Sequence, residues 1–210
     1  MLRSHFSRRL WLILTLIGAI LLTTGAGMRA YAQITMRQTE QHLLASVPTT
    51  IATASISFPR ASGVPTRLSL PSLDLWNALT PVMLADTPSG LAWQVADAGW
   101  YINSGVPGEG HNVVIAGHSP SAEPSTWSHS VFRQLAYLQP DDRIELTSGA
   151  RSYHYTVAHV FAIPAAQAND AASQRWLQSG DSERLTLITC WPPHTAAYRV
   201  IVIAIPSQVS

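Results

Sequence analysis

The sequence contains one cysteine, Cys190, and a single thiol is a candidate nucleophile. It follows the apolar, β-branched run Leu185–Thr189, which predicts a strand, and Trp191-Pro192-Pro193 comes next, where a regular ladder is expected to stop. Catalytic side chains are often found where a rigid strand meets an accessible loop. Because the thiolate attacks rather than the thiol, such a nucleophile needs a proton acceptor or a cation nearby. An intermolecular disulfide and an inert buried thiol are the alternative readings.

Histidine is the first candidate for the proton acceptor, and the sequence has eight. His118 follows the apolar run Asn112–Gly117 as Cys190 follows its own run, so two strand ends could face one cleft. His129, in a serine-rich loop, and His194, four residues past Cys190, remain alternatives. A histidine at a strand end can also be purely structural.

Arg199 is the candidate cation, because it opens the last predicted strand, Tyr198–Ile205. If this strand returns antiparallel to Leu185–Thr189, Arg199 and Cys190 lie near the same end of neighbouring strands. A guanidinium stays charged at all relevant pH values and can stabilise negative charge that develops on a carbonyl oxygen. The alternative is an ordinary arginine that points into water.

The elements that must position these residues are predicted to be strands of an all-β domain spanning residues 67–210. Eight candidate strands suit a closed barrel. They are Arg67–Leu70, Leu75–Leu79, Gly99–Ile102, Asn112–Ala116, Arg143–Thr147, Arg151–Ile163, Arg184–Thr189 and Tyr198–Ile205. Arg143–Thr147 and Arg151–Ile163 alternate around Ser148-Gly149-Ala150 and predict a hairpin. Val131–Leu138 and Ala166–Gln178 have the apolar spacing of short helices.

The N-terminal segment, residues 1–28, is predicted to be a membrane anchor. Leu10–Met28 carries no charge, and Arg3, Arg8 and Arg9 precede it. This run is almost long enough to cross the hydrocarbon layer, and the positive-inside bias keeps the N-terminus cytoplasmic and the remainder outside the cell membrane. A cleaved signal peptide ending at Ala30-Tyr31-Ala32 is the alternative. Residues 29–66, rich in Thr, Ser and Pro, predict an extracytoplasmic linker, in which Ile34–Leu44 could continue as a helix.

Charge composition limits the partners. Thirteen basic residues against twelve acidic residues give a formal charge of +1, which argues against a nucleic-acid partner. No acidic cluster suggests a calcium site, so neither a metal nor another cofactor is expected.

Three separated motifs together resemble the sortase family of cysteine transpeptidases. Leu185–Cys190 is similar to the family's Thr-Leu-x-Thr-Cys signature, Val114–Ser119 to its histidine motif, and Tyr198-Arg199-Val200 to its arginine strand. The order of His118, Cys190 and Arg199 along the chain also agrees. The resemblance covers residues 67–206, and the short loop containing Trp191-Pro192-Pro193 is most similar to class D or E sortases.

The resemblance implies an eight-stranded sortase barrel and acyl transfer in two steps. Cys190 would attack a threonine carbonyl in a signal similar to Leu-Pro-x-Thr-Gly, on a surface protein, to give a thioacyl enzyme. An amine acceptor, such as a cell-wall precursor or a pilin lysine, would resolve it. His118 would act as acid and base, Arg199 as electrostatic partner, and Thr189 as a substrate or oxyanion contact.

Two other functions would use the same residues differently. A cysteine peptidase would hydrolyse rather than transfer; in papain-like enzymes the cysteine precedes the histidine, opposite to the order here. A stalked, non-enzymatic surface β-domain would bury Cys190 as an inert thiol.

Overall fold

A computed structural model describes residues 3–50, 63–87, 90–93, 97–120, 130–178 and 180–207. For residues 3–23, 85–87 and 90–93 it describes the backbone alone. The chain divides into two compact units, residues 1–41 and residues 42–210. The segment borders predicted after residues 28 and 66 stay predictions.

The first unit consists of helix α1, Arg3–Ala45, up to residue 41, and the last four residues of the helix are assigned to the second unit. The predicted span Leu10–Met28 falls within α1, mostly on residues whose side chains lie outside the described part. Among the described residues, no helix is both long enough and apolar enough to cross a membrane. The first part of the predicted linker is helical, including Ile34–Leu44, because it is rich in helix-forming Ala, Gln, Met and Arg.

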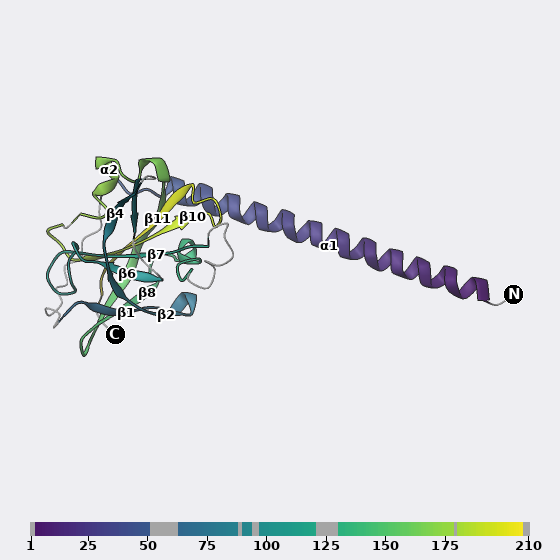
Figure 1. Cartoon of the computed structure of the whole chain (residues 1–210), viewed down its shortest axis with the longest axis horizontal. Helices are drawn as coiled ribbons and strands as arrows, with labels where there is room; N and C mark the ends of the chain where they lie inside the picture. The colour runs from purple at the N-terminus through teal and green to yellow at the C-terminus, as the bar shows by residue number, and fades with distance from the viewer. Residues whose placement is uncertain are drawn as a thin grey trace. The chain divides into compact units, whose positions relative to one another are not determined.

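The second unit is a mainly β domain built on one nine-stranded sheet (Figure 1). Its strands lie in the order β2-β1-β8-β9-β11-β10-β7-β6-β3. Their bounds are β1 Pro65–Leu70, β2 Leu75–Ala78, β3 Thr80–Val82, β6 Ala98–Tyr101, β7 Asn112–Gly117, β8 Arg143–Ser148, β9 Arg151–Pro164, β10 Arg184–Trp191 and β11 Tyr198–Pro206. A separate hairpin pairs β4, Leu84–Thr87, with β5, Gly90–Trp93.

All eight predicted strands are present, including the β8–β9 hairpin, but the predicted strand number was wrong. The sheet has nine strands because β3 is added at its edge, next to β6. β3 has only three residues and contains Pro81, so no alternation marks it in the sequence. β10 also extends two residues beyond its predicted end, because Cys190 and Trp191 still pair with β11 before the prolines begin.

The sheet closes nearly into a barrel because its two edge strands follow each other in the chain. β2 ends at Ala78 and β3 begins at Thr80, so only the buried Leu79 separates the edges. The amide of Leu79 donates a hydrogen bond to the carbonyl of Thr66 on β1, at 2.8 Å. The two ends of the sheet therefore come together at one residue.

The connections outside the sheet are shorter than the predicted helices. Leu135–Tyr137 forms one 3₁₀ turn (η3) in place of a helix over Val131–Leu138. The segment predicted over Ala166–Gln178 is divided into the 3₁₀ turn Ala165–Gln167 (η4) and helix α2, Ala171–Gln174. Asp170 has an extended backbone conformation and separates η4 from α2. Each piece is then too short for the hydrogen bonds of a stable, longer helix.

Glu183, one residue before β10, fixes a distant loop to the sheet. The residue is 7% exposed, and its carboxylate accepts hydrogen bonds from the amides of Gly108 and Gly110 and from the hydroxyl of Tyr155. Both glycines have positive φ, which turns their N–H groups toward one point. Burial, followed by the neighbouring charge of Glu183, raises the pKa of Tyr155 well above its usual value, so this hydroxyl stays a donor.

Replacing this carboxylate should destabilise the domain. We expect Glu183→Gln to lower the free energy of unfolding by about 2 kcal/mol, because its amide nitrogen cannot accept the glycine N–H groups. Chemical denaturation followed by fluorescence measures the change. Asp181→Asn, at an exposed position two residues away, is the matched control. Equal midpoints for the two variants would contradict a stabilising role for Glu183.

Candidate active site

Cys190 and Arg199 lie directly opposite each other on neighbouring strands. β10 and β11 pair antiparallel, as the sequence predicted, and in their register Cys190 faces Arg199 while Ile188 faces Ile201. Opposed residues of an antiparallel pair project to the same face, with Cβ atoms about 5 Å apart. The thiol and the guanidinium therefore leave the sheet on the same side.

His118 follows the last residue of β7, the strand on the other side of β10. β7 and β10 pair in parallel, and their register ends with Ala116 beside Ile188. If the same register continued for two more residues, His118 would come level with Cys190 on the neighbouring chain segment. The hydroxyl of Thr189 donates to the carbonyl of Gly117 at 2.8 Å, which keeps the two strand ends together just before these residues.

The face that carries Cys190 and Arg199 is apolar farther along the same strands. Ala116, Ile188 and Ile201 belong to a buried cluster that is covered by Trp176, whose ring packs on Phe161 at 4.8 Å. Because side chains alternate along a strand, Cys190 and Arg199 stand two positions beyond Ile188 and Ile201 on this face. The polar groups thus come at the open end of a packed apolar layer.

The backbone of His118 is held from two sides. Its amide donates to the carbonyl of Asp97, at 3.2 Å, and its carbonyl accepts from the amide of Phe132, at 3.0 Å. The buried ring of Phe132 lies against Gly117, where a Cβ atom would come within 2.5 Å of a ring carbon. Position 117 therefore requires glycine, and Phe132 is a positioning residue that sequence patterns did not reveal; Gly117 before a strand-end histidine was the only signal.

Exposure differs among the four predicted site residues. His118 is exposed, and Cys190 and Arg199 are partly buried, so a substrate can reach all three positions. The guanidinium Nη1 donates to the carbonyls of Ala196 and Tyr198, at 3.1 and 3.3 Å. Thr189 is 4% exposed, and its side chain leaves the sheet on the face opposite to Cys190. Its predicted contact with substrate stays a prediction.

The structure describes one of the two alternative histidines. His129 falls outside the described residues. His194 is in the β10–β11 loop with φ 74°, and its amide donates to the carbonyl of Pro120. Within the described residues, no group of three or more His, Cys, Asp or Glu side chains is arranged to hold a metal ion. The expected lack of a cofactor stays a prediction.

Removing the hydroxyl of Thr189 should loosen the two strand ends. We expect Thr189→Val to lower the free energy of unfolding by about 1–3 kcal/mol, because the carbonyl of Gly117 loses its buried donor. Thr189→Ser keeps the hydroxyl and is the matched control. Thermal unfolding of both variants measures the difference. A valine variant as stable as the serine variant would show that the hydrogen bond from Thr189 to Gly117 does not stabilise the domain.

The comparisons with known proteins agree on one family. The sortase domain model matches residues 68–207. No curated protein matches the chain significantly. Among solved structures, the sortase D5 transpeptidase of Clostridium perfringens is 21% identical with a TM-score of 0.52, over 72% of this chain and 83% of that chain.

Sortases of other classes have the same fold. Sortase E1 of Streptomyces coelicolor, solved with a tripeptide in its active site, is 22% identical with a TM-score of 0.51, over 71% of this chain and 91% of that chain. Sortase A of Listeria monocytogenes is 22% identical with a TM-score of 0.52, over 70% of this chain and 89% of that chain. The domain model covers two thirds of the sequence, and the nearly closed barrel is shared with these structures, so this chain belongs to the sortase family of cysteine transpeptidases.

Proposed function

We propose that this sortase cleaves a sorting signal similar to Leu-Pro-x-Thr-Gly on surface proteins and transfers the threonine acyl group to an amine acceptor. The observation that supports this proposal is the strand register that sets Cys190 opposite Arg199 and pairs the strands that lead to Cys190 and His118. Such a trio at an accessible strand end suits nucleophilic catalysis with acid–base help.

In the first step the thiolate of Cys190 attacks the threonine carbonyl carbon. A C–S bond forms, and the carbonyl electron pair moves onto oxygen. When this intermediate collapses, the C–N bond breaks, and protonated His118 gives its proton to the departing amine. The product is a thioester on Cys190 and a free glycine amine.

In the second step the acceptor amine attacks the thioester carbonyl. His118, now neutral, takes the proton of the incoming amine, the C–S bond breaks, and Cys190 leaves as a thiolate. An amide replaces the thioester, so no external energy source is needed. Attack by water in place of the amine would give hydrolysis, the outcome expected of a peptidase.

Arg199 is proposed to stabilise the oxyanion in both steps. Its charge lies on the same sheet face as the thiol, and partial burial strengthens a charge-assisted hydrogen bond. Nη1 already donates to the carbonyls of Ala196, in the β10–β11 loop, and Tyr198, at the start of β11, which restricts the side chain. Thr189 is proposed to contribute as a substrate contact and by holding β7 and β10 together.

We further propose that residues 1–28 anchor the enzyme in the cell membrane, with a cytoplasmic N-terminus and an extracellular catalytic domain. The uncharged run Leu10–Met28 after three arginines supports this topology. Surface proteins would then meet the active site as they emerge from the membrane, and a cell-wall precursor or a pilin lysine would serve as acceptor. The Trp-Pro-Pro sequence after Cys190 favours class D or E.

The transpeptidase mechanism predicts a covalent adduct on one residue. We expect the full-length enzyme, given a sorting-signal peptide without an acceptor, to gain the acyl mass at Cys190, and to release an amide product once triglycine is added. The sequence has no lysine, so no side-chain amine can capture the acyl group. Intact-mass spectrometry and peptide mapping locate the adduct.

Variants separate the three roles. Cys190→Ala should form no adduct, His118→Ala should lower the rate by about 10²–10⁴-fold, and Arg199→Ala should lower it by about 10²–10³-fold. His159→Ala, on β9, is the matched histidine control and should retain activity. An unmodified Cys190 with every sorting-signal peptide would support a non-enzymatic domain, and hydrolysis despite saturating triglycine would support a peptidase.

The anchor predicts that the full-length protein stays with the membrane. We expect it in the pellet after alkaline carbonate extraction, because an apolar span is held by the lipid core rather than by surface charge. A chain starting at residue 29 is the control and should be released. Recovery of the full-length protein in the soluble fraction would contradict the anchor.

A further inference from the structure

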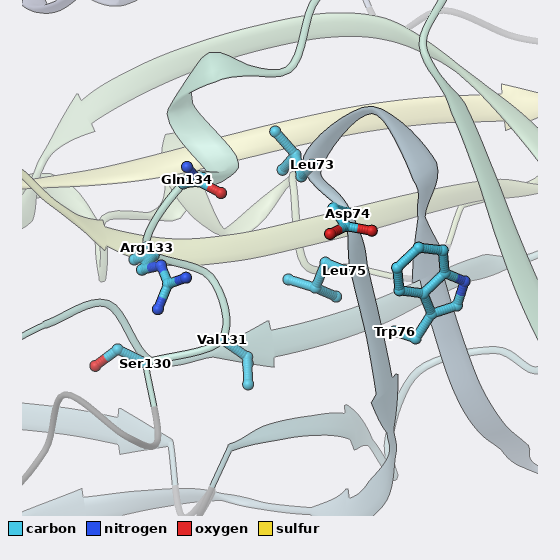
Figure 2. A pocket seen from close by; sticks show the side chains of 8 residues that line it. All are labelled: Leu73, Asp74, Leu75, Trp76, Ser130, Val131, Arg133 and Gln134. Atoms are coloured by element: carbon cyan, nitrogen blue, oxygen red, sulfur yellow. The ribbon is translucent and has the colours of Figure 1, made fainter.

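A pocket of about 200 Å³ lies between two parts of the chain. One wall is formed by residues 73–76, at the β1–β2 connection and the start of β2, and the other by residues between 130 and 134. Figure 2 shows Ser130, Arg133 and Gln134 on one side and Asp74, Leu75 and Trp76 on the other. Leu73 and Val131 complete the lining. Trp76 is 62% exposed, which is unusual for so large an apolar side chain.

Charged groups of both signs face this pocket without neutralising each other. Asp74 and Arg133 are exposed, and no hydrogen bond or ion pair within 4.0 Å joins their side chains to each other in the described part of the chain. Asp74 has φ 50° and ends the 3₁₀ turn η1, Pro71–Leu73, so its carboxylate lies on the wall formed by the β1–β2 connection. A ligand that carries both an ammonium and a carboxylate would complement these walls.

The wall that carries Arg133 is attached to the active site at two points. Phe132, the preceding residue, donates its amide to the carbonyl of His118. Farther along the same segment, the ring of Tyr137 packs edge-on against Trp191, the residue after Cys190, with centroids 5.8 Å apart. Arg133 therefore stands one residue from the contact with His118, on a segment that bridges both catalytic strand ends.

We propose that this pocket binds the acceptor peptide of the second step and selects acceptors that carry a free carboxylate. Arg133 would pair with the carboxylate, and the amide of Gln134 can donate beside it. Asp74 would attract a second, non-reacting ammonium, and the exposed face of Trp76 would cover the aliphatic part of the peptide. This inference rests on the proposed transpeptidation and adds a charge preference to its acceptor.

The test is a competition between two acceptors in one tube. The full-length enzyme receives a saturating sorting-signal peptide and equal amounts of two triglycine peptides, one with a free C-terminal carboxylate and one with a carboxamide. We expect about two- to fivefold more carboxylate product, the range of a solvent-exposed ion pair, and a smaller excess at high salt. Mass spectrometry gives the ratio, in which the overall activity of each variant cancels.

Substitutions assign the preference to the pocket. Arg133→Gln should bring the product ratio to about one, and Arg133→Glu should invert it in favour of the carboxamide. Arg151→Gln, an exposed arginine at the β8–β9 turn, is the matched control and should keep the wild-type ratio. Asp74→Asn should remove the advantage of an acceptor that bears an additional ammonium group.

The outcomes distinguish the two proposals. Acylation of Cys190 with equal amounts of both products in the wild type would overturn the acceptor pocket while leaving the transpeptidase mechanism standing. A preference that survives in Arg133→Gln would also overturn it, because the charge preference would then come from another site. Failure of the wild type to form any acyl enzyme would refute the proposed function, and the pocket assignment would fall with it.

Discussion

The parallel pairing of β7 with β10 is the constraint on which the candidate site depends. Neither strand carries the whole site, and about seventy residues separate them in the sequence, so it is their ladder that brings together the strand ends leading to His118 and Cys190. The bond from Thr189 to the carbonyl of Gly117 extends this pairing to the last residue before the histidine. A shift by one residue would turn Cys190 to the opposite face of the sheet. The register is therefore a chemical requirement as well as a packing one.

The register is secured by burial on both faces of the central strands. Leu185 and Leu187 are fully buried on one side of β10, and Ile188 belongs to the cluster under Trp176 on the other. A slip would exchange these environments and leave cavities in a close-packed interior. At the start of β10, Glu183 adds a polar restraint by holding the loop that contains Gly108 and Gly110. Packing and buried hydrogen bonds thus act on the same strand, so its far end can present a partly exposed thiol in a defined position.

The segment Ser130–Tyr137 links the surface of the domain to its catalytic end. Phe132 fills the space that a side chain at position 117 would take, and Tyr137 contacts the ring of Trp191. Between them in the sequence, Arg133 and Gln134 line the pocket, and Asp74 lies on its other side (Figure 2). A ligand there would press on the same residues that position His118 and the β10–β11 loop. Acceptor binding and the geometry of the second chemical step are therefore expected to be coupled.

The sequence alone determined the local features of this protein. Eight strands, the β8–β9 hairpin and the strand-end positions of Cys190, His118 and Arg199 could all be predicted, because alternation, turn residues and prolines act over a few neighbouring residues. β3 was not predicted, because three residues that include a proline show no alternation. The two predicted helices are single turns in the structure: η3 is one 3₁₀ turn, and Asp170 divides the other segment. The burial of Thr189, the contact of Phe132 with Gly117, the Glu183 network and the pocket at Arg133 were decided only by the tertiary structure. Each joins residues that lie far apart in the chain, and such contacts leave no periodic trace in the sequence because they depend on which strands become neighbours.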